Sequence, residues 1–129
     1  MSLTITGLYA GLLALVGVVL SFHVGGGRLK SGISLGTGDN ADLLERVRRH
    51  ANFVEYVPIA LILLAILEIN GKGATTLHVL GSTLLVARII HPFGLSVAEM
   101  KKTPRLMGAL LTTIVIVVSA CMAIWQYVG

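Results

Sequence analysis

Three polar side chains at helical spacing lie at the beginning of a long apolar segment. Arg48, Asn52 and Glu55 are separated by four and three residues, so on an α-helix all three share one face. Such groups are costly at membrane depth and normally face a bundle interior or a wet cavity. Arginine binds carboxylates through paired hydrogen bonds, and a lone glutamate suits an ammonium group. The triplet therefore indicates a site for a small zwitterionic ligand, such as a peptide with excess carboxylate.

Further polar residues are expected at the same level of the molecule. Arg88 and His91 lie three residues apart near the end of a third apolar segment, Tyr56 adjoins the triplet, and Arg28 and Arg105 flank the first and fourth segments. A cation beside a thiol lowers the thiol pKa and raises the fraction of reactive thiolate. Each unit of that shift needs about 1.4 kcal/mol of differential stabilisation, which one partly desolvated arginine can supply.

The composition is that of a membrane protein. Of the 129 residues, 55% are hydrophobic and 12% are charged, whereas soluble domains carry about 25% charged residues. Aromatic residues make up only 5%, so no nucleic-acid surface is expected despite the net positive charge. Cys121 is the single cysteine and cannot form an intrachain disulfide. The scattered histidines show no metal-ligand spacing, and no metal site is predicted.

Four apolar segments predict one domain over residues 1–129, an all-α integral membrane protein folded as an antiparallel bundle of four transmembrane helices. Each segment is long enough to cross a hydrocarbon core of about 30 Å; the expected spans are residues 3–24, 41–69, 74–92 and 104–127. The glycines at 25–27 are expected to end the first helix and to open a loop that begins at Arg28. Asp39 or Asn40 is expected to cap the second helix.

The second segment carries three further signals. Asn70 and Gly71 are expected to end its helix. Pro58 lies inside it, where the missing N–H and the bulk of the ring predict a kink. Glu68, near the far end, is interpreted as a solvated helix terminus.

Basic residues set the expected orientation. Lysine and arginine gather around the first and third loops, whereas the second loop carries only Lys72. By the positive-inside rule the first and third loops are cytoplasmic and both termini are outside. The polar constellation then lies near the cytoplasmic face.

Two stretches resemble a known family. Residues 45–58 read ERVRRHANFVEYVP, which resembles the signature of the membrane-associated proteins in eicosanoid and glutathione metabolism, the MAPEG family. The core pattern of that signature is met by Arg48, Asn52 and Glu55. Residues 88–94, RIIHPFG, are similar to the end of the family's third helix. Length, span count and loop charge resemble the short bacterial branch of the family.

The resemblance implies a function and an assembly. It implies a homotrimer in a bacterial inner membrane that binds glutathione as co-substrate between neighbouring subunits, and acts as a transferase or peroxidase on lipophilic small molecules from the lipid bilayer. The residues that would hold glutathione are Arg28, Arg48, Asn52, Glu55, Tyr56, Arg88 and His91. Arg105 would stabilise the thiolate, with Lys102 as the alternative.

The chain also departs from the family's pattern. Leu95 and Val97 stand where the eicosanoid enzymes often carry a tyrosine and a nearby arginine. Because the family includes a lipid-binding, non-catalytic member, a lipid-binding or scaffold protein of the same fold is the alternative function. A small four-helix drug exporter is disfavoured, because such transporters typically place a carboxylate in the first span and this one has none.

Each polar residue also has a purely structural interpretation. Arg48 and Arg105 fit topogenic charges near the headgroups. Asn52 fits a hydrogen bond between helices, and Glu55 fits an ion pair with Arg48 or Arg88. The sequence alone leaves these alternatives open.

Overall fold

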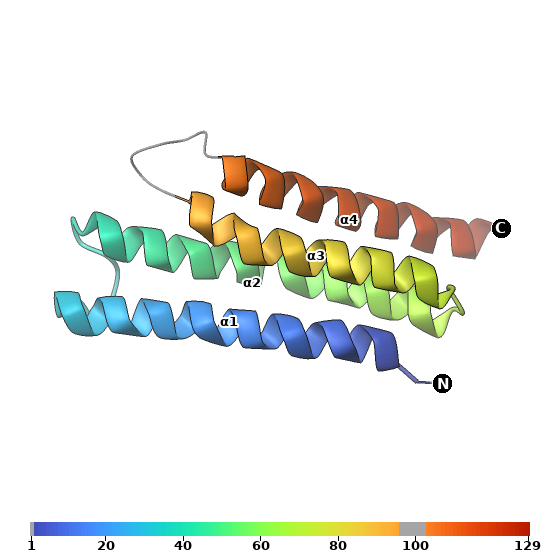
Figure 1. The fold of residues 1–129 in the computed structure, drawn as a ribbon, viewed down its shortest axis with the longest axis horizontal. Helices are drawn as coiled ribbons and strands as arrows, with labels where there is room; N and C mark the ends of the chain where they lie inside the picture. Colours follow the sequence, from blue (N-terminus) through green and yellow to red (C-terminus); the bar gives the residue numbers. More distant parts are fainter. Residues whose placement is uncertain (1, 96–102) are drawn as a thin grey trace.

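The computed structural model describes residues 2–95 and 103–129, which form four long helices. The helices are α1 (Thr4–Ser31), α2 (Ala41–Ile69), α3 (Ala74–Gly94) and α4 (Thr103–Val128). They run antiparallel, so both termini lie at the same end of the bundle (Figure 1). Each helix is long and apolar enough to cross a membrane, which confirms the predicted all-α architecture of four membrane helices. Val97, Lys101 and Lys102 lie outside the described residues.

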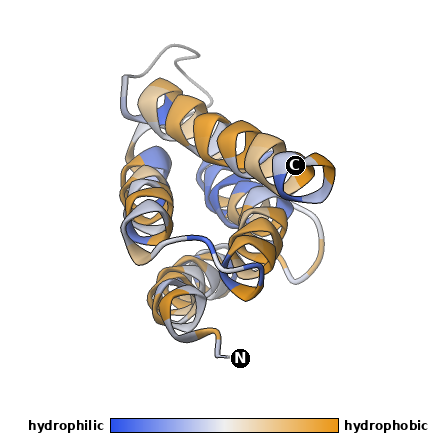
Figure 2. Ribbon diagram, turned by 90° about the vertical axis from the view of Figure 1, so that its right-hand side faces the viewer, coloured by the Kyte–Doolittle hydropathy of each residue, from blue (hydrophilic) through white to orange (hydrophobic). Residues whose placement is uncertain are grey.

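The middle of the bundle is formed by α2 and α3. Both α1 and α4 pack on these two helices, and within the described ranges α1 and α4 make no close backbone contact with each other. Seen from the end, α1 and α4 therefore lie on opposite sides of the central pair (Figure 2). The interior is filled by buried apolar side chains from all four helices, among them Leu13, Phe53, Leu64, Leu84 and Val115.

The first helix is longer than expected, because the glycines at 25–27 do not end it. A Cβ at Gly27 would lie 2.7 Å from Cδ of Arg46, and Nη1 of Arg46 donates to the carbonyl of His23 at 3.0 Å. The glycine makes room for this side chain of α2 and does not break the helix. The helix ends at Gly32, whose φ of 72° is the left-handed conformation typical of a helix end. Arg28, expected in the loop, lies in the last turn of α1.

The second helix begins and ends at local sequence signals. The side chain of Asn40 accepts a hydrogen bond from the backbone N–H of Leu43 at 2.9 Å and so caps α2. At the other end Gly71 has φ 81° and donates its N–H to the carbonyl of Glu68 at 3.0 Å. Pro58 lies inside α2. Pro92 likewise lies inside a helix, α3. This helix continues past its expected end at residue 92 and ends at Gly94.

The interpretation of Glu68 as a solvated terminus is incomplete, because this partly exposed side chain is also bonded to another helix. Its carboxylate accepts hydrogen bonds from the backbone N–H groups of Ile5 at 2.9 Å and Thr6 at 2.7 Å. These N–H groups belong to the first turn of α1, which has no acceptor within its own helix for them. A carboxylate also suits the positive end of the helix dipole. Glu68 thus ties the end of α2 to the beginning of α1.

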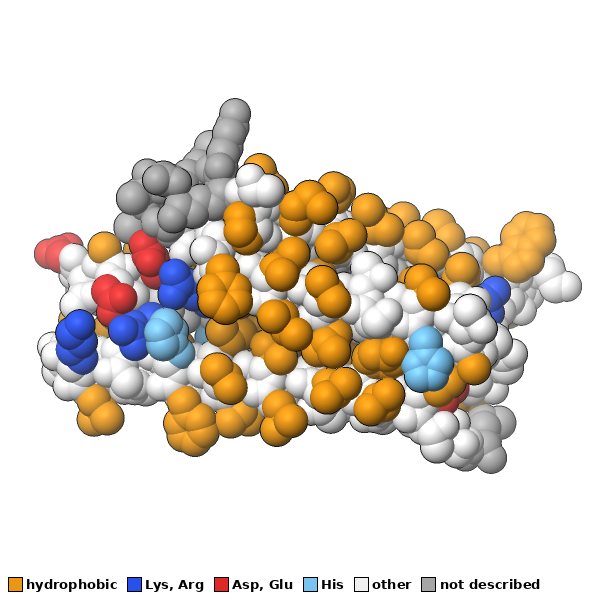
Figure 3. Space-filling model, in the orientation of Figure 1, with side chains coloured by type: hydrophobic (Ala, Val, Ile, Leu, Met, Phe, Trp, Pro, Cys, Tyr) orange, Lys and Arg blue, Asp and Glu red, His pale blue; other side chains and the backbone are white. Residues whose placement is uncertain are grey.

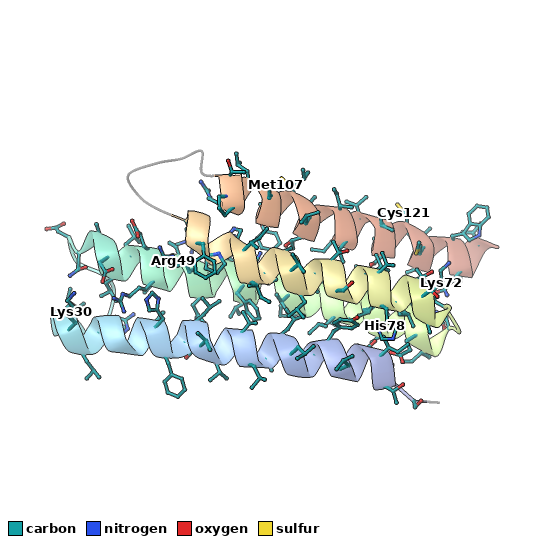
Figure 4. All side chains as sticks on the ribbon, viewed as in Figure 1. Lys30, Arg49, Lys72, His78, Met107 and Cys121 are labelled. Atoms are coloured by element: carbon teal, nitrogen blue, oxygen red, sulfur yellow. The ribbon has the colours of Figure 1, made fainter. Side chains whose placement is uncertain are left out.

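A second polar contact closes the same end of the bundle. The hydroxyl of Tyr9 lies 2.9 Å from Nδ1 of His78, and the two rings meet edge to face. The Tyr9 ring fills the space above Gly81, where an added Cβ would overlap it. His78 is labelled at this end in Figure 4. Small residues that admit close packing are typical of helix contacts in membranes.

Candidate functional site

Charged side chains gather at the end of the bundle opposite the termini. On the face shown in Figure 3, lysine, arginine, aspartate and glutamate cluster where α1 and α3 finish, and hydrophobic side chains cover the middle. Figure 4 places Lys30 and Arg49 toward this end and Lys72 at the other. The asymmetry matches the distribution of basic residues from which the orientation was predicted.

Two glycines bring the ends of α3 and α4 together. A Cβ on Gly108 would lie 2.6 Å from Cβ of His91 and 2.7 Å from the carbonyl oxygen of Ala87. A Cβ on Gly94 would overlap the backbone of Arg105. Only glycine allows this approach of the two helices. The contact sets the polar end of α3 beside the first turns of α4, and thereby places His91 and Arg105 on one cavity.

A cavity of about 410 Å³ opens between α2, α3 and α4 at this end. Six of the eight residues predicted for the site line it: Arg48, Asn52, Tyr56, Arg88, His91 and Arg105. They come from three helices, so the structure gathers side chains that are up to 57 positions apart (105 − 48) in the sequence. The other lining residues are Leu95, Ala109, Thr112 and Thr113.

Arg88 is the deepest cation of the cavity. Its side chain is 1% exposed, its Nη2 donates to Oδ1 of Asn52 at 2.8 Å, and its guanidinium carbon lies 5.8 Å from the centroid of the Phe53 ring. Within the described part of the chain no carboxylate pairs with it, and its Nε has no hydrogen-bond partner. A buried charge costs several kcal/mol when it is not paired. The site is therefore electrostatically incomplete and favours an anionic ligand.

His91 adds a second unsatisfied group to the same wall. It is 2% exposed, and its Nδ1 has no partner within the described residues. Buried polar atoms are nearly always hydrogen-bonded in native proteins. Two such atoms on neighbouring turns of α3, both on residues that line the cavity, indicate that a ligand or water completes the site.

Arg48 and Glu55 lie at the outer edge of the cavity. Nη2 of Arg48 is 3.3 Å from Oε1 of Glu55, and each side chain is 50% exposed. Glu55 pairs with Arg48 and not with Arg88, and it does not line the cavity itself. An exposed pair of this kind contributes at most about 1 kcal/mol to stability. Both groups can therefore exchange their mutual contact for a ligand at little cost.

Arg28 is not brought to the cavity. Its Nη1 donates to the carbonyls of Ile33 at 3.1 Å and Gly36 at 2.9 Å, so within one chain it organises the loop after α1. Lys102, the alternative to Arg105 as thiolate stabiliser, lies outside the described residues. Arg105 itself lines the cavity from the first turn of α4.

Beyond Arg105, the sequence analysis did not identify the residues of α4 that line the cavity. Ala109, Thr112 and Thr113 follow Arg105 at intervals of four, seven and eight residues, which is one face of a helix. The Thr112 hydroxyl donates to the carbonyl of Gly108 at 2.7 Å and the Thr113 hydroxyl to Ala109 at 2.9 Å. Because these protons are used within α4, the hydroxyl oxygens present only acceptor lone pairs. The helical spacing from Arg105 was the available signal.

The fold and the site define a class: an integral membrane protein of four antiparallel helices with an arginine-lined cavity at one end. Residues 6–125 match the MAPEG family, and the chain belongs to that family. It is 37% identical over 90 residues to the inner membrane protein YecN of Escherichia coli strain K12, which covers 70% of this chain and 69% of that protein. YecN of Escherichia coli O6:H1, strain CFT073, gives the same values. The four apolar helices and these relatives support an integral inner membrane protein.

Proposed function

We propose that this protein binds glutathione in the arginine-lined cavity and transfers its thiolate to lipophilic electrophiles, or uses it to reduce lipid hydroperoxides. The observation that carries the proposal is the incomplete polar wall of the cavity. It holds three arginines, a buried histidine and an amide, and Arg88 has no carboxylate partner within the described ranges. A tripeptide with two carboxylates and one ammonium group matches that set in charge.

Each side chain has a role in this proposal. Arg88 and Arg48 bind the carboxylates of glutathione, because a guanidinium meets a carboxylate through two hydrogen bonds. Glu55 turns from Arg48 to the ammonium group of the ligand. Asn52, already bound to Arg88, uses its NH₂ group to donate to a peptide carbonyl. Tyr56 and His91 close the cavity around the peptide.

Arg105 is proposed as the group that stabilises the thiolate. A cation next to the sulfur lowers the thiol pKa and favours the nucleophilic form. The thiolate sulfur then attacks the electrophilic carbon, and the leaving group departs with its electron pair. The protein contributes charge stabilisation and proximity, and no covalent intermediate forms on its side chains.

The assembly proposed with this function is a homotrimer with the site near the cytoplasmic face and the termini outside. Arg28 would reach glutathione from a neighbouring subunit, since within its own chain it does not line the cavity. The lipophilic substrate would enter from the bilayer.

Leu95 favours a second candidate, a lipid-binding protein without catalysis. This apolar side chain lines the cavity among the arginines, where a polar side chain would add a contact to glutathione. A cavity with a cationic wall and an apolar patch also suits the head and first methylenes of a lipid. Conjugation of glutathione to 1-chloro-2,4-dinitrobenzene by the purified protein separates the two functions: turnover supports the transferase, and bound lipid without turnover supports the second candidate.

Calorimetric titration of the detergent-purified protein with glutathione tests the binding step. Arg48→Ala and Glu55→Ala are expected to weaken binding at least tenfold, since each removes a charge-assisted hydrogen bond worth about 1.5–3 kcal/mol. Arg46→Ala is the matched control, because Arg46 lies on the same helix but bonds to Asp42 and to the backbone of His23. Unchanged glutathione binding in both Arg48→Ala and Glu55→Ala would contradict the proposal.

A further inference from the structure

A second hollow lies on the other side of Arg88, between α1 and α3. It encloses about 680 Å³. Its walls are apolar side chains that include Val16, Val19, Phe22, Ile89 and Phe93. Val19, Phe22 and Phe93 are 67%, 76% and 78% exposed, so the hollow opens on the lateral, apolar surface of the bundle. We call it the α1–α3 groove.

One end of the α1–α3 groove is cationic. His23, Arg49 and Arg88 line it there, and Figure 4 places Arg49 toward the charged end of the bundle. Nη2 of Arg49 is held by Glu45 at 3.4 Å and by the carbonyl of Leu95 at 3.0 Å. This leaves the Nε of Arg49 buried without a partner within the described residues, as is the Nε of Arg88.

The unpartnered Nε of Arg49 points to an anion in the groove. Arg88 is 1% exposed and lines both the cavity and the groove. A buried donor without an acceptor costs about 1–3 kcal/mol, and more when it is charged. Glu45, the carboxylate that pairs with Arg49, does not line the groove. The cationic end of the groove therefore has more hydrogen-bond donors than the described residues supply acceptors.

We propose that the α1–α3 groove binds one anionic phospholipid of the surrounding bilayer. The phosphate accepts hydrogen bonds at the Arg49 and His23 end, and one acyl chain lies along Val16, Val19 and Phe93. Charge complementarity and position argue for this occupant. The groove opens where lipid chains surround the bundle, and its cations stand at the charged end, where headgroups lie. The proposal does not require glutathione, because the phosphate contacts Arg49 and His23, which do not line the cavity.

Lipid titration followed by native mass spectrometry tests the assignment. The full chain in neutral detergent is titrated with dioleoyl phosphatidylglycerol or dioleoyl phosphatidylcholine, which carry the same chains. We expect the anionic lipid to bind about fivefold more tightly, the effect of one basic residue close to an anionic headgroup. Equal binding of the two lipids would overturn the proposal.

Two pairs of variants locate the lipid. Val19→Trp fills the groove and is expected to remove the fivefold preference, whereas Val18→Trp introduces the same side chain on an exposed position that does not line the groove. Arg49→Gln is expected to remove the preference and Arg48→Gln to retain it. If Arg49→Gln does not fold, the valine pair alone decides. A preference that survives Val19→Trp, or that is lost equally in Val18→Trp, contradicts the site.

Two competitors identify the chemistry of the occupant. Inorganic phosphate at the lipid's concentration supplies the anion without a chain, and oleate supplies a carboxylate with a single chain. Neither is expected to displace phosphatidylglycerol at equal concentration. Displacement by phosphate would show a simple anion site, and displacement by oleate would show a fatty-acid site; either overturns the phospholipid assignment.

Discussion

At the end of the bundle where the termini lie, Glu68, Tyr9 and His78 have hydrogen-bond partners on other helices, although Oγ1 of Thr6 is buried without one within the described residues. Glu68 accepts two backbone hydrogen bonds from the first turn of α1, and Tyr9 bonds to His78. At the opposite end Arg88 and His91 are more deeply buried, at 1% and 2% exposure, yet each keeps an atom without a partner within the described residues. Both ends join helices through polar side chains, but among the described residues only the end with Arg88 buries an unpartnered atom of a charged side chain. We call the end with the termini the closed end and the end with the cavity the open end, and the proposed function places the ligand at the open end.

Substitution of a polar side chain is expected to change the stability of the protein differently at the two ends. Removing a satisfied group at the closed end strands its partners and lowers stability. Removing the buried charge at the open end takes away a desolvation cost that no carboxylate of residues 2–95 and 103–129 offsets. Stability and ligand binding should therefore respond to substitutions at opposite ends of the molecule.

Arg88→Met is expected to have the largest effect on binding. Glutathione affinity should fall by about thirtyfold or more, because loss of one partner of a buried charge pair costs about 2–5 kcal/mol. The stability of the protein should stay the same or rise, since an apolar side chain replaces an unpaired buried charge. Calorimetry and the thermal unfolding midpoint in detergent measure the two quantities. Leu84→Met, one turn earlier in the buried core, is the control and should leave both nearly unchanged.

Gly108→Ala tests the contact that shapes the open end. The added methyl would overlap His91 and the backbone of Ala87, so α3 and α4 must separate. Overpacking of this kind typically costs about 1–3 kcal/mol, and the displaced wall should also weaken glutathione binding. Gly11→Ala is the matched control, because nothing lies within 4 Å of its new Cβ. Equal stability of the two variants, measured by detergent denaturation, would contradict the close packing.

Glu68→Ala is expected to lower stability without changing glutathione affinity, the opposite of the effect of Arg88→Met. It leaves the N–H groups of Ile5 and Thr6 without their acceptor and should lower the free energy of unfolding by about 2 kcal/mol. Glutathione affinity should not change. Glu68→Gln keeps one acceptor oxygen and should lie between the wild type and the alanine variant. A loss of affinity in Glu68→Ala that exceeds its loss of stability would break the division between the ends.

Tyr9→Phe should have the smallest effect. It removes one hydroxyl from the contact with His78 while the ring stays packed on Gly81. The net contribution of one such hydrogen bond is about 1 kcal/mol. A small drop in the unfolding midpoint with unchanged ligand binding is expected. Tyr56→Phe, at the open end, should show the reverse pattern.

The parts of the molecule that local signals determine could be predicted from the sequence. The Asn40 cap and the turn at Asn70 and Gly71 each depend on a few neighbouring residues. The grouping of Arg48 and Asn52 in the cavity likewise depends on spacing along a single helix. Charge and hydropathy patterns sufficed for the number of helices.

The wrong or incomplete predictions concern contacts between helices. The residues 25–27 were expected to break α1, but Gly27 faces Arg46 from α2. Glu68 accepts hydrogen bonds from Ile5 and Thr6, which are 63 and 62 positions away in the chain. A local sequence pattern cannot predict such a contact. Thr112 and Thr113 were not predicted as site residues, because the sequence alone does not say which face of α4 lines a cavity. Arg28 does not line the cavity of its own chain, where loop carbonyls bind its guanidinium, and its contact with glutathione from a neighbouring subunit stays a prediction.

Amide hydrogen exchange with and without glutathione tests the division between the ends most directly. Exchange reports local opening along the chain, so both ends are read in one experiment. Glutathione is predicted to slow exchange in residues 48–56, 88–95 and 105–113 and to leave residues 5–9 and 66–78 unchanged. Protection confined to the end with the termini, or no protection at either end, would contradict the assignment of the open end as the glutathione site.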